Sequence, residues 1–238
     1  MRKSTIGATR AKASKRKENE DSGVKSHKDI EGFEDWIDEK DAADLAADAY
    51  KDTKVGETVN GWTIVDSYDE KATGFQAKLY EKNGKYVFAT AGTNPRSGKD
   101  WLNNIAQQFG RRSKQYDRSI ELAQMYSQKY DNLIFVGHSL GGGLASANSR
   151  ATGCSAITFN AAALSSRYNY GLSSKIAAYI SDGDILDYVN EVLLHQSVEG
   201  NIIRRSVSAS KLPNLQGIPL TGIYQAIRGV KAHTDYKF

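Results

Sequence analysis

The order of hydrophobic and polar positions predicts a chain that begins with a helix and continues as antiparallel strands. The alanine-rich segment 41–50 has aspartates in its first turns, which favours a helix by propensity and by interaction with the helix dipole. Segments 62–68 and 74–80 alternate apolar and polar residues, as half-buried strands do. Asn83 and Gly84 connect the second segment to residues 86–90 and form the typical sequence of a type I′ hairpin turn. This part of the chain therefore predicts an antiparallel meander.

Beyond residue 98 the pattern changes to alternating helices and strands. Residues 133–136 form a continuous apolar run, as expected for a strand that a parallel sheet buries on both faces. The other predicted elements are helices at 99–109, 117–129 and after 139, strands at 156–159 and 175–180, a hairpin within 191–207 and a glycine-punctuated end. No internal repeat and no second domain are found. The sequence thus predicts an α/β fold with a mostly parallel central sheet, an antiparallel N-terminal meander and flanking helices.

The composition fits one globular domain. A chain of 238 residues is long enough for an α/β domain with a sizeable core. It has no run of about 20 apolar residues, and its basic N-terminus lacks the apolar segment and cleavage site of a standard secretory signal. Cys154 is the single cysteine, so it forms no internal disulfide, and its apolar surroundings predict a buried thiol. We expect a cytoplasmic protein, or one exported without a standard signal peptide.

The basic charge of the chain lies at its N-terminus. Residues 1–30 hold nine Lys and Arg and four Asp and Glu, whereas residues 31–238 hold 23 basic and 24 acidic side chains. The first segment is also poor in large apolar residues, so we expect a disordered tail at 1–30 and one domain at 31–238. The tail is interpreted as solvated, or as a segment that visits anionic lipid or serves in export. Because no aromatic residues interleave with its basic ones, a nucleic-acid partner is not expected.

The chemistry of the chain centres on residues 137–141, which we call the nucleophile turn. They read Gly-His-Ser-Leu-Gly, a G-x-S-x-G sequence that follows the apolar strand and precedes a helix of small residues. Gly137 and Gly141 allow the strand and the helix to approach closely on either side of Ser139. Taken alone, the motif is a common turn between strand and helix. In this strand–turn–helix context it predicts that Ser139 is a nucleophile.

A serine nucleophile needs a general base, usually a histidine, and the chain has four. His27 lies in the tail, and His138 adjoins Ser139 in a turn that directs neighbouring side chains apart. His195 and His233 are left, both downstream of the serine as in the α/β-hydrolase order Ser, Asp, His. His233 is far enough along the chain to fold back over the sheet and is preferred, with His195 as the alternative.

The carboxylate that orients the base is expected in a loop just after a strand. The strand predicted to end near Ile180 is followed by a turn that carries Asp182 and Asp184. An Asp-Gly turn is often structural, and Asp182 is suited to stabilise the turn before Gly183. We therefore prefer Asp184 as the acid, with Asp182 as the alternative.

Two hydrogen-bond donors are expected for the oxyanion. One is the backbone N–H of Leu140, directly after the nucleophile. The other is expected from the loop after an early strand, where Thr93 offers both its N–H and its hydroxyl. Residues 141–143 lack the Lys-Ser/Thr that would make them a nucleotide-binding loop, and no metal-ligand cluster is visible. The sequence therefore predicts no cofactor and no metal.

Four pieces of the sequence occur in an order that resembles a known family. They are Phe88–Thr93 followed by Asp100-Trp101, the stretch Val136–Gly142, the turn Gly183–Ile185, and His233. In this order, and with the alanine-rich helix before them, they are similar to the class 3 lipases, the fungal-lipase-like branch of the α/β-hydrolases. The resemblance covers roughly residues 40–238, and only the nucleophile turn is highly specific. Lacking a signal peptide and disulfides, the chain looks nearer to bacterial phospholipases A1 and lipase-type effectors than to secreted lipases.

The resemblance implies hydrolysis of a lipid ester, as in a phospholipase A1 or an acylglycerol lipase. It also implies a lid within 94–109, although the face formed by Trp101, Ile105 and Phe109 is equally compatible with a helix that packs on the core. The expected partners are a lipid ester and, transiently, a membrane surface, while the oligomeric state is left open. A small-ester or thioester hydrolase on the same residues, and a non-catalytic binding module of this fold, are the alternatives.

Overall fold

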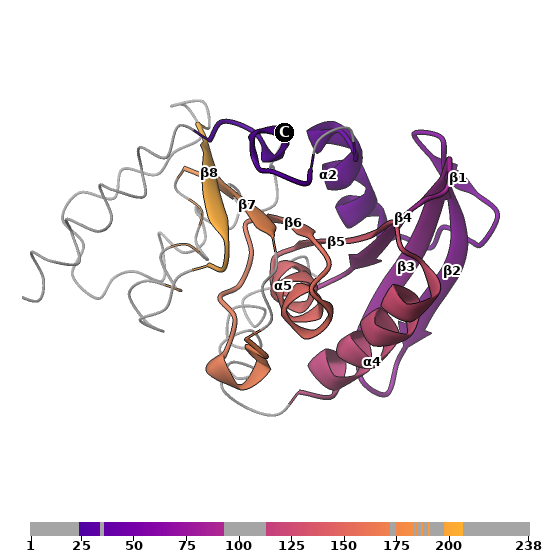
Figure 1. Cartoon of the computed structure of the whole chain (residues 1–238). Coiled ribbons are helices and arrows are strands. Elements are labelled where there is room, and N and C mark those ends of the chain that lie inside the picture. The colour runs from indigo at the N-terminus through magenta and orange to yellow at the C-terminus, as the bar shows by residue number, and fades with distance from the viewer. Residues whose placement is uncertain are drawn as a thin grey trace, which may run out of the picture.

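The computed structural model describes residues 24–33, 36–92, 113–171, 175–182 and 198–206, together with residues 184, 187 and 190. These residues form one sheet of eight strands, and the spatial order of the strands follows the chain from β1 to β8. Helices cover both faces of the sheet (Figure 1). The predicted class, an α/β fold with a mixed sheet and flanking helices, is confirmed.

The first four strands form the predicted antiparallel meander. They are β1 (Thr58–Val59), β2 (Trp62–Glu70), β3 (Phe75–Lys82) and β4 (Lys85–Thr90). Each pairs with its neighbour antiparallel. Between β3 and β4, Asn83 and Gly84 both have positive φ, 54° and 73°, as a type I′ turn requires. The hairpin prediction is confirmed.

From β4 onward the pairing is parallel. The strands β5 (Leu133–His138), β6 (Ala156–Phe159), β7 (Ile176–Ser181) and β8 (Asn201–Arg205) follow in that order. The hairpin predicted within 191–207 is corrected at β8, which pairs with β7 in parallel; residues 191–197 lie outside the described residues. The five residues of β8 show no strict alternation of polar and apolar side chains, so the sequence alone could not determine the direction of its pairing.

The helices divide between the two faces. The helices α4 (Lys114–Lys129) and α5 (Leu140–Thr152) lie on one face, and α2 (Glu39–Asp48) lies on the other (Figure 1). Parallel strands that follow one another across a sheet need right-handed crossovers, which keep the connecting helices on one face. Every residue of β5 is buried, because Phe135 packs with α4 and α5 while Val136 packs with the α2 side.

Three details differ from the sequence prediction or lie outside the described residues. The helix predicted at 117–129 begins at Lys114. Cys154 is partly exposed at the edge of the core and not fully buried, because it follows the glycine that ends α5. The helix predicted at 99–109 and the chain after residue 206 lie outside the described residues. No helix in the described part of the chain is long and apolar enough to cross a membrane.

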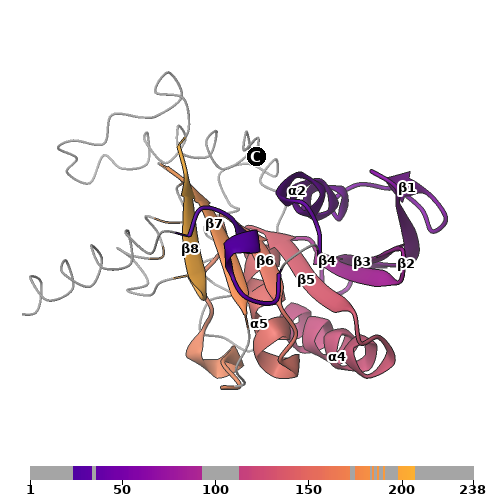
Figure 2. The ribbon, with the colours of Figure 1, turned by 45° about the horizontal axis from the view of Figure 1, so that its top comes forward.

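Residues 24–33 run along the parallel half of the sheet (Figure 2). They contain a short helix, η1 (His27–Asp29), whose His27 is fully buried. The Nε2 atom of His27 lies 2.7 Å from the Ile37 carbonyl and so carries the proton, and Nδ1 accepts from the Tyr179 hydroxyl at 2.7 Å. Residues 24–29 therefore pack against the domain, although the charge pattern placed them in the tail. The expectation of a disordered tail at 1–30 is therefore wrong for residues 24–30, and residues 1–23 lie outside the described part of the chain.

We predict that His27 makes the stability of the protein depend on pH. Burial lowers the pKa of His27 below its ordinary value of 6.5, against a smaller opposing effect of the Ile37 carbonyl. Since the unfolded chain then takes up the proton first, the contribution of His27 is complete above pH 6.5 and decreases as the pH falls through the lowered pKa. Urea unfolding of the wild type and of His27→Gln across this range should show the difference between them shrinking towards acid. Equal pH slopes for the two proteins would contradict the assignment.

Candidate active site

Ser139 occupies a strained turn between β5 and α5, as the sequence predicts. Its φ of 59° and ψ of −129° lie outside the regions that non-glycine residues ordinarily adopt, a conformation that costs about 1–3 kcal/mol. The turn is held by main-chain hydrogen bonds: the Ser139 N–H donates to the Phe159 carbonyl at 3.1 Å, and the Ser139 carbonyl accepts from Ala162 at 3.0 Å. Both partners follow or end β6, so the neighbouring strand fixes the conformation of the serine.

The two glycines of the motif are required by close contact between backbones. A Cβ atom on Gly137 would lie 2.2 Å from the carbonyl oxygen of Gly141, and one on Gly141 would lie 2.2 Å from the carbonyl oxygen of Thr90. The Thr90 hydroxyl also donates to the Gly141 carbonyl at 2.7 Å. The last residue of β4 thus contacts the first turn of α5 directly. The predicted reason for these glycines is confirmed.

The amino end of α5 meets the chain that leaves β4. A Cβ atom on Gly92 would lie 2.9 Å from the nitrogen of Leu140 and 2.7 Å from that of Gly141. The first N–H groups of a helix have no partner within the helix and carry a partial positive charge, so they suit a developing oxyanion. Leu140 is the first residue of α5, and its role as a donor stays a prediction. Thr93, the other predicted donor, lies outside the described residues.

Asp184 follows β7 and is buried, with 3% of its surface exposed. Its N–H donates to the Ser181 carbonyl at 3.1 Å, and its Oδ1 accepts from the Asp187 N–H at 3.3 Å. The other candidate, Asp182, is half-buried, and its N–H donates to the Arg205 carbonyl of β8 at 2.9 Å. Asp184 thus has a buried carboxylate in the loop after β7, whereas the backbone of Asp182 continues the pairing between β7 and β8.

Ser139 and Asp184 come from the same edge of the sheet. Ser139 follows β5 and Asp184 follows β7, and β6 lies between these two parallel strands. Two strand spacings amount to roughly 10 Å, a gap that a single imidazole and the two side chains can bridge. Because parallel strands end at a common edge, Ser139 and Asp184 both lie at this edge of the sheet.

Asn160, a residue that sequence reasoning missed, ties this edge together. It follows β6 with a positive φ of 43° and is buried. Its Oδ1 accepts from the Ser181 N–H at 2.8 Å, and its Nδ2 donates to the Ser181 hydroxyl at 3.3 Å. An asparagine directly after a buried strand is a signal for such a turn, since asparagine tolerates positive φ better than most residues.

Tyr50 is the second residue that the sequence did not reveal. It follows the last turn of α2, and its hydroxyl donates to the His138 carbonyl at 3.0 Å and accepts from the Gly92 N–H at 2.8 Å. Its ring contacts the ring of His138 edge to face, at 6.3 Å between centroids. Burial raises the pKa of the Tyr50 phenol well above its ordinary value, so the hydroxyl stays neutral and keeps its proton for the His138 carbonyl.

The two candidate bases, His195 and His233, lie outside the described residues. Ser139 is fully buried, and among the residues that the structure describes its Oγ has no hydrogen-bond partner. Leaving a buried hydroxyl without a partner costs about 1–3 kcal/mol. The environment of Oγ is therefore compatible with a base supplied by a segment outside the described ranges.

Comparison with known proteins bears on the fold and the family. A family model described as a Tle-like phospholipase domain matches residues 40–235. The extracellular phospholipase A1 of Serratia liquefaciens is 43% identical over 100 residues, which are 42% of this chain and 31% of that enzyme. The match thus spans about a third of the length of that relative.

Two solved structures share the fold at low sequence identity. A triacylglycerol lipase from Penicillium expansum matches with a TM-score of 0.53 and 18% identity, over 72% of this chain and 79% of that one. Lipase II from Rhizopus niveus matches with a TM-score of 0.52 and 14% identity, over 71% and 79% of the two chains. The predicted α/β-hydrolase fold and the resemblance to fungal-type lipases are confirmed.

The glycine contacts generate a prediction for Gly137→Ala. The new Cβ would push α5 away from β5, so we expect a loss of unfolding free energy of about 1–3 kcal/mol and slower reaction of Ser139 with a fluorophosphonate. Gly171→Ala is the matched control, because Gly171 has space around it and a φ of 73°, so its substitution adds backbone strain without a clash. Urea unfolding and labelling rates measure both variants. Equal labelling rates in the two would show that the close contact at Gly137 does not shape the turn.

Proposed function

The chain belongs to the family of Tle-like phospholipase domains, and we propose that it hydrolyses a carboxylic ester of a lipid through an acyl-enzyme on Ser139. The observation that carries the proposal is the placement of Ser139. The serine is held in a strained turn at the amino end of α5, on the sheet edge that also carries the buried Asp184. A plain strand–helix turn needs neither the strain nor the buried carboxylate two strands away.

The proposed reaction uses five residues. The Ser139 hydroxyl attacks the ester carbonyl and passes its proton to His233, whose imidazole Asp184 orients. The N–H groups of Leu140 and Thr93 hold the oxyanion of the tetrahedral intermediate. When the intermediate collapses, His233 gives the proton to the leaving alcohol and the acyl group stays on Ser139. Water, deprotonated by His233, then releases the fatty acid and restores the serine.

The direction of β8 supports His233 over His195 as the base. Arg205, at the end of β8, pairs with Ser181 at the edge where Ser139 lies, and His233 follows Arg205 in the sequence. The start of β8, six residues after His195 in the sequence, lies at the opposite edge. There Glu199 binds Arg150, in the last turn of α5, at 2.6 Å.

The length of α5 gives the scale of this separation. Arg150 is eleven residues along the helix from Ser139, or about 16 Å at the rise of an α-helix. The chain therefore enters β8 far from Ser139 and leaves it at the edge where Ser139 lies. This direction supports a base that follows β8 in the sequence, as His233 does.

The proposed substrate is a phospholipid or an acylglycerol at a membrane surface. The family and the Serratia liquefaciens relative, which carries the name of a phospholipase A1, support this class. We further propose that the basic residues of the first 30 positions bring the enzyme to anionic lipid, as in an exported effector, since each basic residue near such a surface contributes about 1 kcal/mol. Hydrolysis of small soluble esters on the same residues is the second candidate.

We predict that the protein releases fatty acid from vesicles of phosphatidylcholine and phosphatidylglycerol, and that Ser139→Ala lowers the rate by about 10⁴-fold or more. Ser146→Ala is the matched control, because Ser146 is a buried serine on α5 that takes part in no proposed step. This variant should keep the activity. Fatty-acid release and fluorophosphonate labelling are measured together. Turnover of a short-chain ester without any response to vesicles would favour the second candidate. Absence of labelling in the wild type would favour a binding module.

The assignment of the base is tested by two single variants. We expect His233→Ala to lower the rate of ester hydrolysis by about 10⁴-fold, while His195→Ala keeps it within about twofold, because the serine relies on one base. Initial rates on a short-chain ester measure both without interference from lipid binding. The reverse result would assign the base to His195.

A further inference from the structure

The Tyr50 hydroxyl joins two backbone segments that the sheet itself leaves unconnected at this point. The parallel ladder between β4 and β5 ends with Thr90 opposite Gly137. The hydroxyl accepts from the N–H of Gly92, two residues beyond Thr90, and donates to the carbonyl of His138, one residue beyond Gly137. Tyr50 thus adds a side-chain connection beyond the last main-chain pair. Its two bonded neighbours are the residue directly before Ser139 and the residue that packs against the Leu140 nitrogen.

At this position, the distance between the two backbones determines how well their N–H groups can bind an oxyanion. Donors must lie about 2.7–3.1 Å from the oxyanion, so a small change in the separation of the two backbones weakens the binding of the transition state. A misplacement of about 1 Å can lower a rate roughly 10²-fold. The Tyr50 hydroxyl contacts the backbone at both Gly92 and His138. Its one proton and its acceptor oxygen are both used in these hydrogen bonds.

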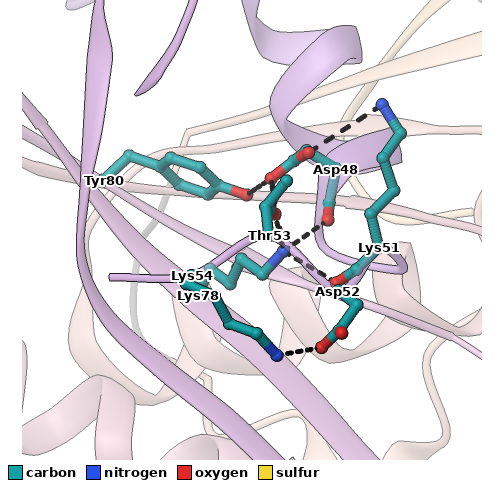
Figure 3. Close-up of polar contacts among 7 residues, drawn as sticks. All are labelled: Asp48, Lys51, Asp52, Thr53, Lys54, Lys78 and Tyr80. Atoms are coloured by element: carbon teal, nitrogen blue, oxygen red, sulfur yellow. Dashed lines mark hydrogen bonds and ion pairs between the residues drawn. The ribbon is translucent and has the colours of Figure 1, made fainter. Parts of the chain in front are cut away.

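A buried ion pair holds the turn that carries Tyr50. Lys78 on β3 and Asp48 at the end of α2 are 3% and 1% exposed, and their charged atoms lie 3.3 Å apart. The Lys78 ammonium also donates to the carbonyls of Asp48 at 2.8 Å and Lys51 at 2.9 Å, on either side of Tyr50 in the chain (Figure 3). A cation at the carboxyl end of α2 is favourable for the helix dipole as well.

The carboxylate of this pair is bound by hydroxyl groups too. Asp48 accepts from Thr53 at 2.7 Å and from Tyr80 at 2.9 Å (Figure 3). Burial acts to raise the pKa of Asp48, but these hydroxyls and the Lys78 ammonium bring it below its ordinary value. Asp48 is therefore ionised at neutral pH, and the turn between α2 and β1 is fixed on both sides of Tyr50.

We propose that Tyr50 is a positioning residue for ester hydrolysis at Ser139: its hydroxyl sets the distance between the backbone at Gly92 and the nucleophile turn, and the Asp48–Lys78 pair fixes the turn that carries it. The inference rests on the proposed function. It gives Tyr50 no proton to transfer, because the phenol contacts two backbone groups and neither the serine hydroxyl nor the carboxylate of Asp184. The effect of Tyr50 on the rate is therefore independent of pH.

The test compares Tyr50→Phe with Tyr126→Phe in the full chain. Tyr50→Phe keeps the ring beside His138 and removes both hydrogen bonds. Tyr126, on α4, is a buried tyrosine whose hydroxyl donates to Asp66 of β2 at 2.6 Å. Initial rates on a short-chain ester are divided by the number of serines that a fluorophosphonate titrates to completion. Molecules that fail to fold then do not enter the comparison.

We expect Tyr50→Phe to lower kcat about 10- to 100-fold with KM within about twofold, and Tyr126→Phe to leave both unchanged. The pH profile of Tyr50→Phe should keep its shape at reduced height. Phosphorus NMR of the phosphonylated serine gives a second readout, since the P–O group occupies the oxyanion site, and its shift should move in Tyr50→Phe alone.

Several results would overturn the proposal, and one separates it from the proposed function. A kcat per titrated serine equal to that of the wild type, together with an unchanged phosphorus shift, would show that the Tyr50 hydroxyl is not needed for positioning. A change in KM alone, or equal losses in Tyr50→Phe and Tyr126→Phe, would indicate a role in binding or in stability instead. If the wild type itself hydrolyses no ester, the proposed function fails and the role of Tyr50 fails with it.

Discussion

Backbone packs directly against backbone where β4, β5 and α5 meet, and the geometry of the candidate site depends on this contact. A single added carbon on Gly137 or Gly141 would lie 2.2 Å from a carbonyl oxygen. With glycine at both positions, α5 can begin at the very end of β5, which brings its first N–H groups next to Ser139. The strained conformation of the serine follows from the same contact, because a looser turn would relax it.

The sequential order of the parallel strands then determines what surrounds the serine. Each strand from β5 to β7 ends at the same edge and is followed by a polar residue with a structural or proposed chemical role, namely Ser139, Asn160 and Asp184. A sheet in which neighbouring strands ran antiparallel would have placed alternate residues at the far edge. The arrangement therefore needs no long loop to bring the serine and the carboxylate together, and Asn160 braces the strand between them.

The sequence was sufficient where a local pattern determines the structure. The hairpin at Asn83 and Gly84 and the strand–turn–helix around Ser139 depend on residues a few positions apart, so their signals can be read directly. Tyr50 could not be found in this way, because its partners lie 42 and 88 residues away and nothing in its neighbourhood distinguishes it from a core tyrosine. The same applies to Lys78, whose burial is explained by a carboxylate 30 residues earlier. The direction of β8 was missed for a related reason, since five residues without a strict alternation of polar and apolar side chains do not identify the neighbouring strand.

The buried contact of His27 with Tyr179 has a consequence for how the domain is delimited. The family model begins at residue 40, yet the segment that carries His27 covers part of β7, and Phe33 belongs to the core on the same face as α2. A fragment cut at the family boundary would remove Phe33 from the core and take away the hydrogen bonds between His27 and the Tyr179 hydroxyl. The unit that can be produced as a self-contained module therefore starts no later than residue 24, inside a stretch whose composition alone suggests that it can be discarded.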